Sequence, residues 1–462
     1  MSTLTIAIIV VFVLGYALIA MESLTKVNKP AVALLMFVFC WTLYMFDPAP
    51  FVQLMHPDFT GTGDKVVSFV NTLITEHLGD TATTLFFLMG AMTIVEIVDQ
   101  NGGFNWVKNV MRSKTKRSLL WKIAFMTFFL SAILDNLTTS IVMVMILRKL
   151  VQDKHDRMIY ASLVIIAANS GGAFSPIGDV TTIMLWNAGM ITAGGVLSEI
   201  FIPSLVSMLI PAFLLQMLLK GNIQYDDMSS DMSGDREVLE FNGFQRKIVF
   251  AIGVGGLCSV PLFHFFTDLP PFAGILLVLG ILWTVTEVFY RNLHKKRGDE
   301  IQFSKRVSSL LSRIDMSTIL FFLGILMAVA CLEEVGVLKE LGSGLNITFN
   351  GNHYAVTGII GVLSAIVDNV PLVAGSMGMY PIGIEPDMAV DGIFWQLLAY
   401  CAGVGGSMLI VGSAAGVVVM GLEKITFGWY MKRITWIAFL GYIAGRSEER
   451  RVGKECASMC RS

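Results

Sequence analysis

Long apolar runs recur along the whole chain and predict its secondary structure. A helix needs roughly 17–25 predominantly apolar residues to cross a bilayer, and runs near that length begin close to the N-terminus and continue to the C-terminal region. The predicted crossings are roughly 4–21, 31–46, 83–100, 158–186, 198–220, 247–266, 271–290, 316–332, 393–420 and a last one from about 433. The pattern therefore predicts an all-α polytopic membrane protein.

Two further apolar segments, 118–150 and 353–380, each carry a polar tip. The first contains LSAILDNLTTS at 130–140, and a closely similar sequence, LSAIVDNVPLV, recurs at 363–373. Basic loops flank 118–150 at both ends, so this segment must leave and return on one side, as a re-entrant hairpin does. Acidic or neutral loops flank 353–380, which predicts a hairpin from the opposite face. Polar backbone at such tips is tolerated where protein or a water-filled cavity surrounds it.

The distribution of Lys and Arg in the short loops predicts the orientation, because basic loops stay in the cytoplasm. The basic loops are 108–117, 148–157, 291–297 and 423–433. The loops 47–64 and 382–391 are acidic or neutral and are expected outside. With these assignments every crossing alternates, and the N-terminus lies outside.

An internal repeat supports this topology. The segment 84–103 aligns with 318–337, and 170–179 aligns with 404–413, in the same order and at almost the same separation as the two polar tips. An odd number of crossings in each copy turns the second copy upside down. We therefore expect two inverted-topology repeats, each of about five transmembrane crossings with a re-entrant hairpin and a broken helix, as in secondary transporters.

The repeat also predicts the domain boundaries. The first repeat covers 1–222, with its hairpin at 118–150 and its broken helix at 158–186; a cytoplasmic linker covers 223–246; the second repeat covers 247–445, with its hairpin at 353–380 and its broken helix at 393–420. After ITWIAFLGYIAG the chain changes to RSEERRVGKECASMCRS at 446–462. We interpret 446–462 as a non-native tail, the alternative being a short native cytosolic tail.

Composition agrees with a membrane protein whose partner is the lipid bilayer. Hydrophobic residues make up 55% of the chain and charged residues 15%, against about 25% charged in a soluble domain, and the mean hydropathy is +0.69. The sequence contains no basic patch with interleaved aromatic residues, so binding to nucleic acid is not predicted. The cysteines have no spacing typical of a disulfide framework or a zinc site, and no cofactor is expected.

Three acids, Asp135, Asp179 and Asp368, fall at predicted helix breaks inside apolar surroundings. Ionisable groups at membrane depth are costly and indicate function. The alternative is that they cap half-helices, and this alternative is strongest for Asp368, which precedes Pro371 near a helix start. Both roles are compatible, because a cap at mid-membrane also faces the cavity. The pairs Glu96–Asp99 and Glu333–Glu334 end crossings and are interpreted as interfacial charges.

The residue types near these breaks favour a sodium site. Hard cations prefer carboxylate, amide, hydroxyl and backbone carbonyl oxygens, whereas an anion site would need helix N-termini without a fixed carboxylate. The first half supplies Asp135, Asn136, Thr138, Thr139, Asn169, Asp179, Thr181 and Thr182, and the second half supplies Asp368, Ser407 and Ser413. Burial disfavours the charged form of a carboxylate, so Na⁺ and H⁺ can compete for the pair Asp135 and Asp179.

Two other functions fit parts of the sequence. The segment PIGD at 176–179 is similar to an intramembrane aspartyl protease motif, but two hairpins and an inverted repeat are not what that chemistry needs, so the chain is not expected to be an enzyme. A sodium-coupled symporter of a small organic or inorganic anion stays the alternative. Tips with Ser, Asn and Thr but without acid would favour the symporter, whereas both tips here carry Asp-Asn.

The motifs LSAILDNLTTS, NSGGAFSPIGDVTTIMLW and LSAIVDNV resemble those of NhaD-type sodium/proton antiporters of the ion transporter superfamily, over essentially 1–445. The resemblance implies an exchanger of cytoplasmic Na⁺ and Li⁺ for external H⁺ in the inner (cytoplasmic) membrane of a bacterium, serving sodium and pH homeostasis. It also implies a scaffold domain, a moving transport domain and a homodimer. The family's polar positions match at Asp135, Asn136, Asn169, Asp179, Thr181, Thr182, Ser364 and Asn369.

Overall fold

The structure is a computed structural model, and it is helical throughout the part of the chain that it describes. It describes residues 2–20, 27–103, 110–111, 113–223, 241–297, 310–311, 314–365, 369–383 and 386–459. In these ranges the β-pairing of the backbone is limited to an isolated bridge between Thr115 and Asn222. The predicted all-α class is confirmed. Asp368 and most of the predicted linker 223–246 lie outside the described residues.

The helices of the first half follow the predicted order. They are α1 (Thr3–Ala20), α3 (Lys29–Phe46), α4 (Ala49–Met55), α5 (Asp64–Gln100), α7 (Lys116–Ser131), α8 (Asn136–Leu150), α9 (Lys154–Ala173), α10 (Val180–Asn187), α11 (Ala193–Glu199) and α12 (Phe201–Leu215).

The second half contains the same kinds of element. They are α13 (Gly243–Thr267), α14 (Pro271–Arg297), α16 (Met316–Glu334), α17 (Val337–Thr348), α18 (His353–Leu363), α19 (Asn369–Met379), the short 3₁₀ helix η4 (Pro386–Met388), α20 (Ile393–Gly405), α21 (Ala414–Glu423), α22 (Phe427–Arg433) and α23 (Thr435–Met459). Within the described residues, five of the helices in the two halves are each long and apolar enough to cross a membrane. The chain is a multi-pass membrane protein.

The helix α5 is longer than the apolar run that predicted it. The run covers 83–100, whereas the helix starts at Asp64 and has 37 residues, about 55 Å at 1.5 Å per residue. Its first half carries polar residues such as Glu76, His77 and Asp80, which lower hydropathy but are compatible with a helix. Because no proline interrupts 64–100, the helix continues where the hydropathy signal ends.

The interruptions at the polar motifs are real breaks between helices. Helix α7 ends at Ser131 and α8 begins at Asn136, while α9 ends at Ala173 and α10 begins at Val180. In the second half a break separates α18 from α19, and another separates α20 from α21. Whether 118–150 and 353–380 turn back inside a bilayer stays a prediction.

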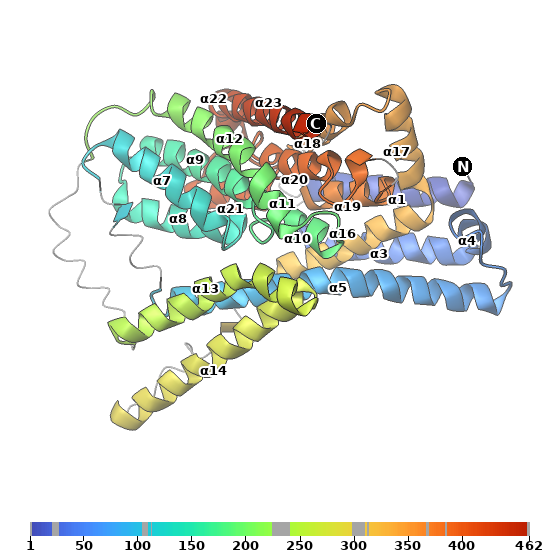
Figure 1. Ribbon diagram of the computed structural model, residues 1–462, viewed down its shortest axis with the longest axis horizontal. Coiled ribbons are helices and arrows are strands. Elements are labelled where there is room, and N and C mark those ends of the chain that lie inside the picture. Colours follow the sequence, from blue (N-terminus) through green and yellow to red (C-terminus); the bar gives the residue numbers. More distant parts are fainter. Residues whose placement is uncertain are drawn as a thin grey trace.

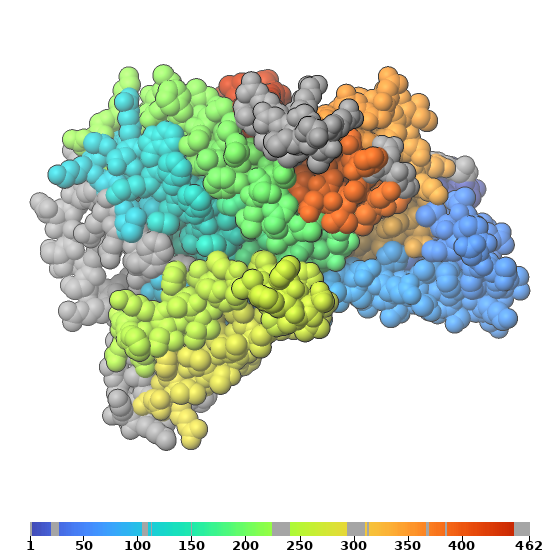
Figure 2. Space-filling view, viewed as in Figure 1, coloured from blue at the N-terminus to red at the C-terminus, as the bar shows by residue number. Residues whose placement is uncertain are grey.

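The helices form two packed groups (Figure 1). In one group α1 contacts α3, α3 contacts α16, α5 contacts α14, and α13 contacts α14. In the other group α7 contacts α9, α8 contacts α21, α18 contacts α20, and α12 contacts α23. Figure 2 shows α13 and α14 projecting from the body of the molecule. The broken helices and both polar motifs belong to the second group.

Close backbone contacts fix the first hairpin against its broken helix. Ser131 Oγ donates to the Ala168 carbonyl at 2.7 Å. A Cβ atom on Gly178 would lie 2.7 Å from the Ser131 carbonyl oxygen, and one on Gly171 would clash with the Phe128 carbonyl. Only glycine allows the backbone to approach this closely, so these glycines set the distance between α7 and the break after α9.

The second hairpin is held in the same way. Ser364 Oγ donates to the Ala402 carbonyl at 2.8 Å. A Cβ atom on Gly412 would lie 2.7 Å from the Ser364 carbonyl oxygen, and one on Gly405 would clash with the Gly361 carbonyl. Each of these residues aligns with its counterpart in the first hairpin, so both halves use one packing scheme at these points.

Candidate functional site

Asp179 lies where the polar tips of both halves meet. It is the N-cap of α10, with its Oδ1 accepting from the Thr181 backbone N–H at 3.3 Å, and it is 1% exposed. The Asn136 amide donates to Asp179 Oδ2 at 3.2 Å. The Asn369 amide donates to both carboxylate oxygens, at 3.3 and 3.1 Å. Neutral amides from two hairpins thus share one buried carboxylate.

A second asparagine joins this cluster to the broken helix of the other half. Asn169 accepts from the Asn136 amide at 3.1 Å. Its own amide donates to Ser407 Oγ and Ser413 Oγ, both at 3.0 Å. Ser413 in turn caps α21, accepting from the Gly416 backbone N–H. Ser407 and Ser413, which the sequence predicts as site residues from the second half, therefore take part in the same network as Asp179. We refer to Asn136, Asn169, Asp179, Asn369, Ser407 and Ser413 as the central network.

Asp135 occupies a different position from Asp179. It is half-buried and caps α8, accepting from the Thr138 backbone N–H and from Thr138 Oγ1, both at 2.7 Å. Its φ of 118° is unusual for a residue other than glycine. The sequence predicts that the two acids act as one pair, but their described hydrogen bonds differ. Asp135 accepts from Thr138 in the first turn of its own helix. Asp179 accepts from asparagine amides of both predicted hairpins.

The other predicted residues divide into two kinds. The hydroxyls of Thr139 and Thr181 are buried and have no hydrogen-bond partner among the described residues, which is unusual for a buried polar group and suits an oxygen that awaits a ligand. Thr182 Oγ1 donates to the Asp179 carbonyl at 2.9 Å. Ser364 holds its hairpin through the Ala402 carbonyl. Asp368 lies outside the described residues.

A polar cavity lies beside the site, between α5, α10, α16 and α19. Its volume is about 640 Å³, and its lining includes His77, Asp80, Asn187, Glu333 and Met377. Helices α10 and α19 begin at the residues that meet in the central network, and their other ends line this cavity. With eight residues, α10 spans about 12 Å. The cavity therefore approaches the carboxylate along two short helices.

Sequence reasoning missed the environment of Glu334. Its position at the end of α16 is interpreted as that of an interfacial charge, and the structure adds that the residue is buried, at 6% exposure. It accepts from His56 Nε2 at 2.8 Å and from His77 Nε2 at 2.9 Å. The partners lie far away in the sequence, and no local motif joins them. The only signal was an acidic pair directly after an apolar run.

Comparison with known proteins gives a consistent assignment. The family model described as "Citrate transporter" (CitMHS) matches residues 16–398. The chain is 40% identical to sodium/proton antiporter 2 of Arabidopsis thaliana, over 94% of this chain and 96% of that protein. Sodium/proton antiporter 1 of the same plant is 42% identical, over 95% of this chain and 71% of that protein.

Bacterial relatives and a solved structure point the same way. The Na⁺/H⁺ antiporter NhaD of Vibrio cholerae is 30% identical, over 96% of this chain and 90% of that protein. The crystal structure of the Alcanivorax borkumensis YdaH transporter superposes with a TM-score of 0.59, covering 90% of this chain and 97% of that chain. At 13% identity this last likeness shows the fold alone.

Proposed function

The chain belongs to the NhaD type of sodium/proton antiporters, within the family described as citrate transporters, and from this premise we infer that it exchanges Na⁺ for H⁺ across a membrane. It is a secondary transporter, which moves ions and does not need catalytic chemistry. We assign it the direction that serves sodium and pH homeostasis, with cytoplasmic Na⁺, and Li⁺ in its place, leaving as external H⁺ enters.

The observation that carries this proposal is the buried Asp179. A carboxylate removed from water is stable only when it is paired, hydrogen-bonded or protonated. The described partners of its side chain are amides of Asn136 and Asn369 and the Thr181 backbone N–H. These described donors are neutral and fix the orientation of the carboxylate, and a carboxylate can take up either a sodium ion or a proton. Because both neutralise one charge, the two compete.

Sodium needs further oxygens beside the carboxylate. The Thr181 hydroxyl follows Asp179 by two residues and is buried without a described partner, so it is a suitable ligand. The Thr139 hydroxyl is buried in the same way near the first tip. Asp135 is the second acid of the proposed site, one residue from Asn136, whose amide reaches Asp179. Thr138 fixes Asp135 and thereby the first turn of α8.

We extend the proposal to the architecture. The equivalent contacts of Ser131 and Ser364, and of Gly178 and Gly412, support two inverted repeats over 1–222 and 247–445, with re-entrant hairpins at 118–150 and 353–380. The group that contains both broken helices is the proposed transport domain, and the group around α3, α5, α14 and α16 is the proposed scaffold. We also propose a homodimer in the inner membrane of a bacterium, as the family resemblance of the sequence motifs implies.

The polar cavity is the proposed external access route. Its acidic and histidine lining lies at the end of α16 and in the first half of α5, which the positive-inside rule places outside. A cation that enters there needs to travel only the length of α10 to reach Asp179. The symporter alternative is not favoured, because the relatives named above are sodium/proton antiporters.

Ion exchange in everted membrane vesicles tests the function. A pH-sensitive dye is quenched when respiration acidifies the vesicle interior, and adding Na⁺ or Li⁺ is expected to restore fluorescence as H⁺ leaves. Addition of K⁺ to the same vesicles measures cation selectivity, and vesicles without the protein give the background. A chain that reaches the membrane but gives no Na⁺-dependent dequenching would contradict the proposal.

A further inference from the structure

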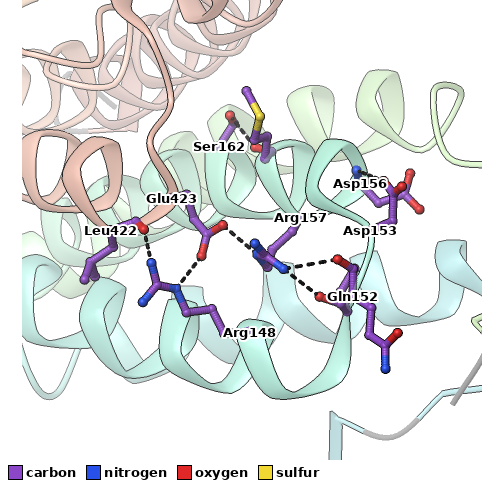
Figure 3. A network of polar contacts seen from close by, with 10 residues as sticks. Arg148, Gln152, Asp153, Asp156, Arg157, Ser162, Leu422 and Glu423 are labelled. Atoms are coloured by element: carbon purple, nitrogen blue, oxygen red, sulfur yellow. Dashed lines mark hydrogen bonds and ion pairs between the residues drawn. The ribbon is translucent and has the colours of Figure 1, made fainter. Parts of the chain in front are cut away.

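An ion cluster around a buried carboxylate lies at the opposite ends of three of the helices that form the central network (Figure 3). Glu423, the last residue of α21, is 2% exposed. Its Oε1 accepts from Arg148 Nε at 2.8 Å, and its Oε2 accepts from Arg157 Nε at 2.6 Å. We refer to Arg148, Arg157 and Glu423 as the Glu423 clasp. Each carboxylate oxygen thus bonds one guanidinium, and the two guanidinium groups share one counter-charge.

The two arginines also bind backbone carbonyls around the carboxylate. Arg148 Nη2 donates to the Leu422 carbonyl, so it contacts the last turn of α21 twice. Arg157 Nη1 donates to the carbonyls of Val151 and Gln152, at 3.1 and 3.3 Å. Charge-assisted bonds of this kind are stronger than neutral ones. Loss of the carboxylate would leave two like charges facing each other at a partly buried site.

The clasp connects three helices that also meet in the central network. Arg148 lies near the end of α8, Arg157 near the start of α9, and Glu423 at the end of α21. At their other ends the same helices are joined again: Asn136 of α8 bonds Asn169 of α9 at 3.1 Å, and Asn169 bonds Ser413, the cap of α21, at 3.0 Å. Helices α8, α9 and α21 are therefore fastened to one another at both ends.

We propose that Arg148, Arg157 and Glu423 are positioning residues for ion exchange, which hold α8 at a fixed height and rotation against α9 and α21. The inference rests on the proposed function of Asp179. Helix α8 has 15 residues, about 22 Å, and a helix transmits a shift at one end to the other. Asn136 lies in the first turn of α8 and donates to Asp179. If the C-terminal end of α8 is no longer held by Glu423, Asn136 is therefore held less firmly against the Asp179 carboxylate. The clasp ties the first half of the chain to the second, so both contribute to one rigid unit around the ion.

The test uses Glu423→Gln, which keeps the shape of the side chain and removes its charge. In purified protein reconstituted in liposomes, we expect the apparent KM for Na⁺ per folded transporter to rise about tenfold. Hydrogen exchange of the α8 backbone should quicken, whereas that of α7, which contributes no residue to the Glu423 clasp, should stay unchanged. Glu423→Asp, which keeps the carboxylate, should recover part of the loss. The control is Asp156→Asn, which breaks the neighbouring Lys116–Asp156 ion pair (2.5 Å) and should leave both readouts unchanged.

Three outcomes would overturn the proposal. A Glu423→Gln protein that melts at a lower temperature but keeps the wild-type KM and wild-type exchange of α8 would show that the clasp only stabilises the fold. An Asp156→Asn protein with the same rise in KM would show that any charge lost at this face suffices. If Glu423→Gln does not fold, Arg148→Gln and Arg157→Gln each leave one ion pair, and wild-type KM in both would also refute the inference. Absence of Na⁺-driven exchange in the wild-type protein refutes the proposed function instead, and the hydrogen-exchange comparison still measures the clasp.

Discussion

The sharpest prediction contrasts two substitutions in the central network, Asp179→Asn and Ser413→Ala. Asp179→Asn replaces the only acid of that network by an amide of nearly the same shape. The Asn136 and Asn369 amides, which now donate to a carboxylate at 3.1–3.3 Å, would face a group that has only one acceptor oxygen. We therefore expect Asp179→Asn to abolish exchange, because an amide can neither release a proton nor neutralise Na⁺.

Ser413→Ala removes one neutral hydroxyl, which accepts from the Asn169 amide and from the Gly416 backbone N–H at the start of α21, and leaves the acid in place. The Asn169 amide loses Ser413 Oγ but keeps Ser407 Oγ at 3.0 Å. Leaving one buried polar contact unmade costs about 1–3 kcal/mol, which corresponds to roughly ten- to a hundredfold in affinity. The expected result is exchange that still saturates, at a Na⁺ concentration higher by that factor.

Sodium titrations of dye dequenching in everted vesicles distinguish the two effects, with immunoblots to show equal amounts in the membrane. Wild-type exchange in Asp179→Asn would refute the assignment of the exchanging carboxylate. A Ser413→Ala protein as inactive as Asp179→Asn would refute the argument that the second half adjusts the site through neutral groups.

Three further predictions use other parts of the molecule. Asp135→Asn should also abolish Na⁺-driven proton movement in the vesicle assay while leaving the protein in the membrane, and normal exchange would remove Asp135 from the site. Gly178→Ala should lower the melting temperature in detergent by several degrees, because its Cβ would lie 2.7 Å from a carbonyl oxygen; Gly280→Ala, whose Cβ would meet open space, is the matched control, and an equal loss in both would contradict the packing argument. Single cysteines labelled with an impermeant reagent in intact cells should report the topology, and labelling at 154 but not at 114 would rule out the first hairpin. We expect protection at positions Lys114, Lys154 and Lys295 and labelling at Asp58 and Asp387.

Most helix boundaries near the site could be predicted from sequence, because local residue types cause them. Glycines and a proline interrupt the apolar frame before Asp179, and a polar cap restarts each helix after the break. The capping alternative for Asp135 and Asp179 is confirmed, because the structure places them at the N-caps of α8 and α10.

Contacts between distant segments could not be predicted in this way. Burial of Glu334 depends on His56 and His77, and burial of Glu423 depends on two arginines from the other half of the chain. In each case the acid looks like an ordinary charge at the end of an apolar run, and only tertiary packing supplies its partners. The separate surroundings of Asp135 and Asp179 have the same origin, because spacing along the chain does not show which tip residues turn toward each other.

The polar cavity beside α10 has a consequence for voltage dependence if it is the external access route proposed for it. Polar side chains such as Asp80, Asn187 and Glu333 line it, and water among them would carry the potential of the outer solution inward. The electric field would then be concentrated over the layer between the cavity floor and the opposite face, rather than spread over the full bilayer. A charge that crosses the whole field gains about 2.3 kcal/mol per 100 mV. On the cavity side an ion would still cross the length of α10, about 12 Å, to reach Asp179, and the remaining field would act on the part of the cycle that carries the site toward the cytoplasm.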